Sequence, residues 1–176
     1  MQKSRMFEKL NEVSKKLGYK NILASPKLEK IVVNMGSGAF KDDKNFMESA
    51  KKDISMITGQ MPNARAAKKA IAGFKVRQGD IVGISATLRG RRMWDFFDKL
   101  NGVVFPRLRD FRGFSKKAFD KKGNYTLGIN DHTVFPEIDA NKVDKVKNLQ
   151  VIFVTTSRDD ASAYALLKTL GFPFRD

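Results

Sequence analysis

The segment IVGISATLRG (81–90) constrains the fold of this chain most strongly, because its apolar and polar residues alternate. A period of two is the pattern of a β-strand with one face against a core and the other face open. The residues expected to point toward the core are Ile84, Ala86 and Leu88. Those expected on the open face are Ser85, Thr87 and Arg89. Such a strand needs neighbouring strands beside it and a cover over its apolar face.

Other segments supply those neighbours. LEKIVVNMG (28–36) also predicts a strand, with Asn34 on its more polar face, and YTLGI (125–129) predicts another. LQVIFVTT (149–156) is apolar on both faces, which is typical of a central strand. QMPNARAA (60–67) is a poorer strand because Pro62 interrupts it, so we expect an edge strand or an extended arm there.

Helices are predicted between these strands. Residues 4–17 carry apolar residues on one helical face. In 41–59, Asp42 or Asp43 can cap a helix that ends at Gly59. Residues 91–104 predict a helix that stops before Pro106.

The last helix is predicted in RDDASAYALLKTLG (158–171), with Asp159 and Asp160 at its N-terminal end and Gly171 as its stop. Its inward residues should be Tyr164, Leu167 and Leu170. Residues 107–124 predict a long loop. The irregular order of strands and helices favours an α+β fold, a single domain over residues 1–176 with a mainly antiparallel sheet.

The charge of the chain is strongly unbalanced. Its 34 Lys and Arg against 19 Asp and Glu give a net charge of +15, and residues 65–122 alone carry +11. Such a concentration indicates a surface for a polyanion. There is no cysteine, so disulfides and thiolate metal sites are excluded. The apolar runs are too short to span a bilayer, and the first residues lack the apolar segment of a signal peptide.

Catalytic chemistry finds little support in the sequence. His132, in a predicted loop, is the only histidine, and it is expected on the surface without a nucleophile or an orienting partner. Residues 83–87 lack the second glycine of a nucleophile elbow, and 36–38 lack the third glycine of a dinucleotide fingerprint. No spacing resembles a metal site. We therefore predict a protein that is not an enzyme and has no cofactor or metal.

RNA binding fits the pattern better. Polar side chains on an open sheet face can bond to base edges, 2′-hydroxyls and phosphates, although solvated sheet faces are often polar for no other reason. Four aromatic residues lie among the cations of the middle third: Phe74, Phe111, Phe114 and Phe119. Each can stack on a base if its ring is exposed, or anchor its loop to the core if it is not.

Several blocks of sequence, in order over nearly the whole chain, resemble one family. These blocks are PKLEKIVVNMG, ITGQMPNARAAKKAIAGFKVRQG, SATLRGRRMWDFFDKL, PRLRDFRGFS, GNYTLGI, FPEID and LLKTLGFPF. They are similar to the bacterial L-five family of large-subunit ribosomal proteins, which bind 5S ribosomal RNA. The resemblance implies helices on one face of the sheet and RNA on the other. By matching motif, it implies four 5S-reading residues: Asn34, Gln60, Thr87 and Arg89.

The resemblance also implies a role for the long basic loop between the second and third strands. In the family this loop reaches the elbow of the peptidyl-site tRNA. Contact with the tRNA would explain why residues 64–79 carry five cations and no acidic residue. The loop residues expected at the tRNA are Lys68, Lys69, Gly73, Phe74, Lys75 and Arg77, with Gly73 and Gly79 allowing the loop to bend. Further basic contacts to RNA are expected from Arg65, Arg91, Arg92, Arg109 and Arg112.

The function so implied is that of a structural protein of the large ribosomal subunit in the cytoplasm. Its expected partners are 5S rRNA, large-subunit rRNA, P-site tRNA, neighbouring proteins of the central protuberance and a small-subunit protein across an intersubunit bridge, with no membrane. Three alternatives stay open: an RNA-binding assembly factor absent from mature subunits, an enzyme acting on RNA, and a membrane-surface protein. The last would need a basic amphipathic helix, whereas the basic excess here lies in loops.

Overall fold

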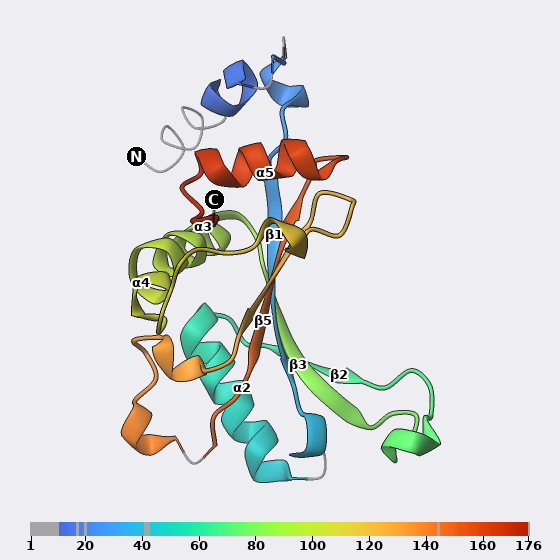
Figure 1. Cartoon of the computed structure of the whole chain (residues 1–176). Helices are drawn as coiled ribbons and strands as arrows, with labels where there is room; N and C mark the ends of the chain where they lie inside the picture. The colour runs from blue at the N-terminus through green and yellow to red at the C-terminus, as the bar shows by residue number, and fades with distance from the viewer. Residues whose placement is uncertain (1–10, 17, 20, 41–42, 144, 176) are drawn as a thin grey trace.

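The computed structural model describes residues 11–16, 18–19, 21–40, 43–143 and 145–175. Of the helix expected over 4–17, residues 11–16 are helical and the others lie outside the described residues. A long, narrow sheet runs through the molecule, and helices lie beside it and across one of its ends (Figure 1).

The sheet has five strands in the order β2-β3-β1-β5-β4, and every neighbouring pair is antiparallel. The strands are β1 Leu28–Gly36, β2 Asn63–Ala66, β3 Ile81–Leu88, β4 Tyr125–Ile129 and β5 Leu149–Thr155. The α+β prediction with an antiparallel sheet is confirmed. β2 is an edge strand, as the interrupting proline predicted, and β5 is paired on both sides.

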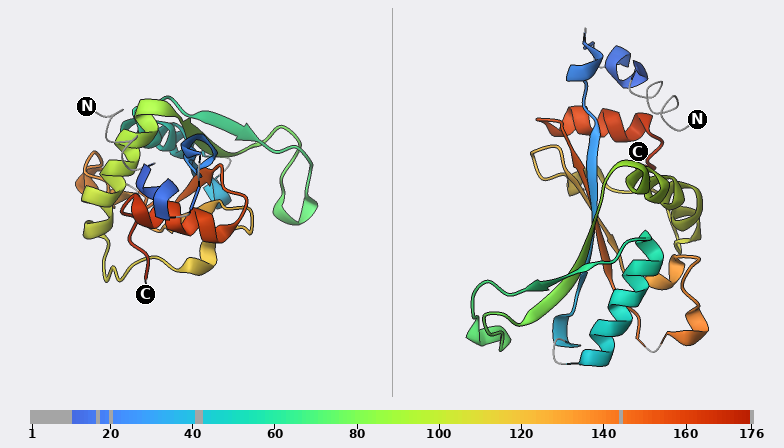
Figure 2. Two further views of the ribbon diagram at one scale, coloured as in Figure 1. Left: turned by 90° about the horizontal axis from the view of Figure 1, so that it is seen from above. Right: turned by 180° about the vertical axis from the view of Figure 1, so that it is seen from behind.

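Helices close one face of the sheet. The principal helices are α2 Lys44–Thr58, α3 Gly90–Lys99 and α5 Asp160–Thr169. Ile54, Phe97 and Leu167 of these helices share one buried cluster with the inward residues of the strands, such as Val33 and Leu88. Seen from above and from behind, the β2–β3 hairpin projects away from the sheet and the helices (Figure 2).

At the start of two helices, the N-cap residue is one of the aspartates that the sequence suggested. The Asp43 carboxylate accepts the Phe46 N–H at 3.1 Å, and α2 ends at Gly59 with φ 65°. The Asp159 carboxylate accepts the Ser162 N–H at 2.8 Å at the start of α5. Side-chain acceptors at these positions satisfy backbone donors that the first helical turn leaves free. In α5, Leu167 and Leu170 are buried as predicted, whereas Tyr164 is only half-buried.

The helix predicted to stop before Pro106 continues through it. After α3 the chain widens into a π-helical turn, Leu100–Val104, and runs into a short α4, Phe105–Arg107. The prediction was wrong because the chain accommodates the proline where the helix widens. Val104 and Phe105 keep helical dihedrals through the π-turn, and the helix ends at Arg107, one residue after Pro106. The Phe105 N–H bonds to the Leu100 carbonyl, as the π-turn requires.

The segment 107–124 is irregular, as predicted, and its aromatic rings are packed. The Phe114 ring lies 4.7 Å from that of Phe105, and the Phe119 ring lies 4.7 Å from that of Tyr125. Phe111 stacks on Phe105 at 5.9 Å. These three phenylalanines are partly buried against the core, so for them the anchoring alternative is correct.

Candidate RNA interface

Among the residues that the structure describes, one face of the sheet has no helix packed on it; this face, here called the open face, carries Asn34, Thr87 and Gln150. Asn34 pairs with Ser85 on β3 and with Gln150 on β5, so these three residues stand side by side across the sheet. Thr87 pairs with Val32, two residues from Asn34 along β1. Such diagonal neighbours lie within about 8 Å of one another.

Asn34 and Thr87 are both half-buried, in agreement with the predicted face. The Asn34 amide nitrogen donates to Gln150 Oε1 at 3.4 Å. Among the described residues, the Thr87 hydroxyl has no hydrogen-bond partner. Two proposed reading residues thus present polar atoms next to each other on the uncovered surface.

Ser85 departs from the prediction. It was expected to be solvent-exposed on the same face, yet it is only 6% exposed. The reason is Arg65 on the neighbouring strand, whose Nε donates to the Ser85 hydroxyl at 2.6 Å.

Gln60 lies just beyond the end of α2 and is occupied by contacts within the protein. Its amide nitrogen donates to the Thr87 carbonyl at 3.1 Å, and its amide oxygen accepts from Arg92 at 3.4 Å. The side chain therefore joins the end of α2 to the end of β3. In this arrangement it holds the backbone of Thr87 and the guanidinium of Arg92 in place.

Arg89 follows β3 and is the N-cap of α3. It forms an exposed ion pair with Glu29 at 3.2 Å, while Arg91 lies 3.6 Å from Asp95. Exposed pairs of this kind contribute about 0–1 kcal/mol. A phosphate can therefore replace the carboxylate at Arg89 with little loss of protein stability.

Residues 67–80 form the basic loop, here called the arm, which extends the β2–β3 hairpin away from the sheet (Figures 1 and 2). Backbone hydrogen bonds close it, among them those from the Ala67 N–H to the Asp80 carbonyl at 2.8 Å and from the Ile71 N–H to the Val76 carbonyl at 2.9 Å. Phe74 at its tip is 76% exposed. For this phenylalanine the anchoring alternative is wrong. The arm cations are all exposed: Lys68, Lys69, Lys75 and Arg77.

The bend of the arm differs from the expectation in one detail. Gly79 has φ 92°, a backbone conformation that glycine adopts more readily than other residues, whereas Gly73 does not have a positive φ. Lys75 takes the left-handed position instead, with φ 50°, and its N–H bonds to the Ala72 carbonyl. The Asp80 carboxylate accepts the Arg77 N–H at 2.8 Å and fixes the return to β3.

The secondary arginines fall into two places. Arg65, Arg91 and Arg92 lie near β2 and β3, close to the open face or its end. Arg109 and Arg112 line a separate hollow of about 740 Å³, between residues 107–113 and 128–134. That hollow adjoins β4, the edge strand opposite β2. The structure therefore does not bring Arg109 and Arg112 together with the open-face residues.

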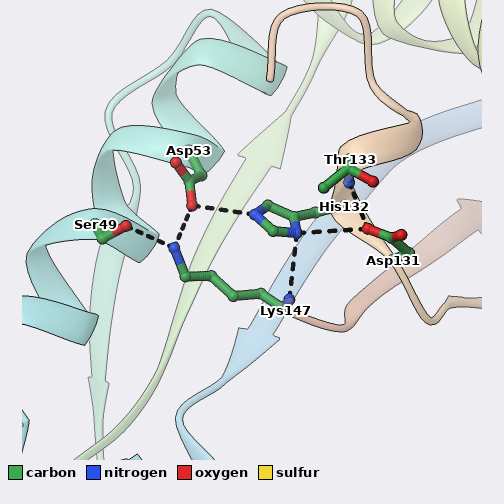
Figure 3. Close-up of polar contacts among 6 residues, drawn as sticks. All are labelled: Ser49, Asp53, Asp131, His132, Thr133 and Lys147. Atoms are coloured by element: carbon green, nitrogen blue, oxygen red, sulfur yellow. Dashed lines mark hydrogen bonds and ion pairs between the residues drawn. The ribbon is translucent and has the colours of Figure 1, made fainter. Parts of the chain in front are cut away.

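His132 was expected on the surface and is completely buried. Its Nδ1 accepts the Lys147 N–H at 3.2 Å, so the proton is on Nε2, which faces the Asp53 carboxylate at 3.5 Å (Figure 3). The Lys147 ammonium donates to Asp53 and to Ser49 Oγ. A histidine without access to solvent cannot contact a substrate, and here it ties the 131–148 segment to α2.

Asp53 is the centre of this buried cluster. Burial opposes its ionisation, but the neighbouring His132 imidazole and the hydrogen bond and charge of Lys147 outweigh burial and lower the pKa of Asp53. Sequence analysis missed the cluster, although one signal was present. Asp53 falls on the same helical stripe as Phe46, Ala50 and Ile57, where a carboxylate needs a buried partner.

Sequence comparison decides the family. A family model described as Ribosomal protein L5 matches residues 21–77, and a second model, described as the C-terminus of the same ribosomal family, matches residues 81–174. The chain belongs to the L5 family of ribosomal proteins.

Relatives of this L5 chain carry the same description. It is 52% identical over 158 residues to Large ribosomal subunit protein uL5 of Roseiflexus castenholzii, which covers 90% of this chain and 88% of that one. It is 45% identical over 175 residues to the uL5 protein of Dichelobacter nodosus, covering 99% and 98%. The uL5 protein of Clostridium botulinum is 51% identical over 159 residues, covering 90% and 89%.

Family membership settles the general role. The chain is a structural, non-catalytic component of the large ribosomal subunit, where its partners are rRNA and other ribosomal proteins, and in bacteria this subunit lies in the cytoplasm. Among the residues that the structure describes, no helix has the length and apolar character needed to cross a bilayer.

Proposed function

We propose that this L5 chain binds 5S rRNA through the open face of its sheet. The observation that carries the proposal is the adjacency of Asn34 and Thr87 on a face that no described helix covers. An amide and a hydroxyl at this spacing can bond to bases, 2′-hydroxyls or phosphates of a single RNA site. Arg89 would supply a phosphate contact at the end of β3, and Gln60 would hold Thr87 and Arg92 in position.

The arm would serve a second RNA. It carries four exposed cations and an exposed aromatic ring on a hairpin that projects from the sheet edge. This combination suits an exposed loop of tRNA, because lysine and arginine bind phosphates and a phenylalanine ring stacks on a base. We propose that the arm contacts the tRNA in the peptidyl site. The relatives' description as subunit proteins favours this role over that of a transient assembly factor.

A binding titration tests the 5S assignment. Pure protein is titrated against 5S rRNA and against a structured RNA of the same length, over a range of salt. Thr87→Ala and Asn34→Ala should each weaken 5S binding by about 1–3 kcal/mol and leave the control RNA unchanged. Thr169→Ala is the matched control, since Thr169 is the half-buried last residue of α5 and its hydroxyl donates to the Ala165 carbonyl.

Equal losses on both RNAs would remove the reading role from Asn34 and Thr87. Equal binding of the wild-type chain to both RNAs, falling steeply with salt, would leave only a phosphate contribution and overturn the 5S proposal. The arm is tested separately. Replacing Lys68, Lys69, Lys75 and Arg77 by glutamine should preserve 5S affinity and reduce tRNA binding to large subunits, and a collapse of 5S affinity would contradict this division.

A further inference from the structure

Arg65 occupies an unusual position for a cation on an edge strand. It pairs with Gly83 across β2 and β3, and paired residues point to the same face of a sheet. Gly83 presents no side chain there, and Ser85 is the next residue of β3 on that face. The Arg65 side chain therefore lies over the open face. Sequence analysis had predicted a secondary basic contact to RNA from this residue, without placing it on a face of the sheet.

Ser85 fixes the direction of this guanidinium. The Nε–H of Arg65 donates to the Ser85 hydroxyl at 2.6 Å, and Ser85 is buried as a result. Five N–H groups belong to a guanidinium, and this contact uses the one nearest the chain. The two terminal nitrogens form the planar fork that binds a phosphate by two parallel hydrogen bonds.

The anchored arginine extends a row of polar side chains. Ser85 stands opposite Asn34, and Asn34 stands opposite Gln150, to which it donates at 3.4 Å. The row Arg65–Ser85–Asn34–Gln150 thus crosses four adjacent strands, β2, β3, β1 and β5. Its cation is at one end and its amides follow on the central strands, so a phosphate and a neighbouring ribose or base can be contacted together.

We propose that Arg65 is a phosphate anchor of the RNA site on the open face, and that Ser85 is the positioning residue that holds its guanidinium toward the RNA. The ligand group is a phosphodiester of the strand whose sugar or base contacts Asn34. The inference rests on the proposed function, since it takes the open face to be the 5S surface. It adds a charged contact on the sheet itself, apart from both the arm and Arg89.

The test uses the full chain and 5S rRNA, with the same-length structured RNA as a second probe. Arg65→Gln removes the charge, and Ser85→Ala keeps the charge but removes its anchor. Arg107→Gln is the matched control, because Arg107 is an exposed arginine of the 107–113 hollow beside the opposite edge strand. Circular dichroism and thermal unfolding of each variant confirm that it is folded.

For Arg65→Gln we expect about a tenfold loss of 5S affinity at about 0.15 M salt, with the slope of log affinity against log salt reduced by about one. Ser85→Ala should lower 5S affinity by a smaller factor while its salt slope stays at the wild-type value, because the number of charges is unchanged. A structural role alone would not separate affinity from salt slope in this way. Arg107→Gln should bind 5S rRNA as the wild type does.

Each other outcome overturns part of the inference. If Arg65→Gln binds like Arg107→Gln, Arg65 is not an anchor. If Arg65→Gln loses affinity but Ser85→Ala does not, Ser85 has no positioning role. If Arg65→Gln weakens both RNAs equally while Thr87→Ala still affects 5S rRNA alone, Arg65 is a general cation and the proposed function stands. If the wild-type chain shows no preference for 5S rRNA, the proposed function fails.

Discussion

Two Gly-Phe dipeptides, each followed by cations, have opposite surroundings in this molecule. Gly73-Phe74 is at the tip of the arm, where the ring is 76% exposed and a Cβ on Gly73 would meet nothing within 4 Å. Gly113-Phe114 is in the 107–124 segment, where the ring packs on Phe105 and Gly113 is pressed against the backbone of residues 174 and 175. The same dipeptide therefore lies exposed at the tip of the arm in one place and packs its segment against the core in the other.

The partners of each segment explain the difference. The 107–124 segment is held by the last residues of the chain: the Phe114 N–H donates to the Pro173 carbonyl, and the Arg175 N–H donates to the Phe114 carbonyl. The backbone hydrogen bonds of the arm, such as that from the Gly79 N–H to the Ala67 carbonyl, join residues of the arm to one another. The same contrast separates the lysines, since Lys69 on the arm is exposed whereas Lys147 is buried against Asp53. Composition alone does not distinguish a surface for RNA from a segment that closes the core.

The largest expected difference in the free energy of unfolding is between variants of Lys147 and Lys69. Lys147→Met should lower the free energy of unfolding by about 3 kcal/mol or more, because it leaves the Asp53 carboxylate without its cation in a buried site. Lys69→Met should change it by less than about 0.5 kcal/mol. Chemical denaturation of both variants measures the difference, and equal stability would contradict the contrast.

The next largest difference in stability is expected between variants of Phe114 and Phe74. Phe114→Ala should cost about 2–4 kcal/mol of unfolding free energy, because it removes a ring packed among Phe105, Phe111 and Phe172. Phe74→Ala should cost less than about 0.5 kcal/mol and should instead weaken tRNA binding to the subunit. Denaturation curves and tRNA binding assays separate the two. A large loss of stability from Phe74→Ala would mean that the ring is not free at the tip.

The glycines give a smaller effect. Gly113 has φ 91°, and an added Cβ would lie 2.7 Å from the Arg175 backbone nitrogen, so Gly113→Ala should cost about 1–3 kcal/mol. Gly73→Ala should be neutral or stabilising by up to about 1 kcal/mol, since an alanine loses less conformational freedom on folding. Thermal unfolding of the pair is the measurement. A destabilising Gly73→Ala would show that the arm needs a glycine there after all.

The last expected effect is a change in pH dependence. The pKa of Asp53 is lowered in the folded chain from its ordinary value of 3.8, so its contribution to stability is present above about pH 4 and is lost as pH falls through the folded-state pKa. The difference in unfolding free energy between the wild type and Asp53→Asn should therefore shrink below about pH 4. Unfolding measured from about pH 7 to about pH 3 tests this. A difference that grows on acidification would assign the cluster a different protonation state.

Much of the fold was predictable because the signals are local. Strand alternation identified β1 and β3, and Pro62 indicated an edge strand. The pairs Asp42-Asp43 and Asp159-Asp160 indicated two helix starts, and the structure shows that Asp43 and Asp159 are the caps. For the candidate site, the same alternation placed Asn34 and Thr87 on the open face. The contact between Arg65 and Ser85 was not predictable, because it depends on the register of β2 against β3.

The antiparallel α+β class, the basic middle of the chain and the family follow from the order of residues, since periodicity, caps, charge and motifs can all be read along the chain. Three-dimensional packing was needed to establish which phenylalanines are exposed, that His132 is buried with Asp53 and Lys147, and that Gln60 bonds to the protein. These features depend on residues far apart in the chain that meet only when the sheet and helices pack. Burial and hydrogen bonding are properties of that packing and not of the local sequence.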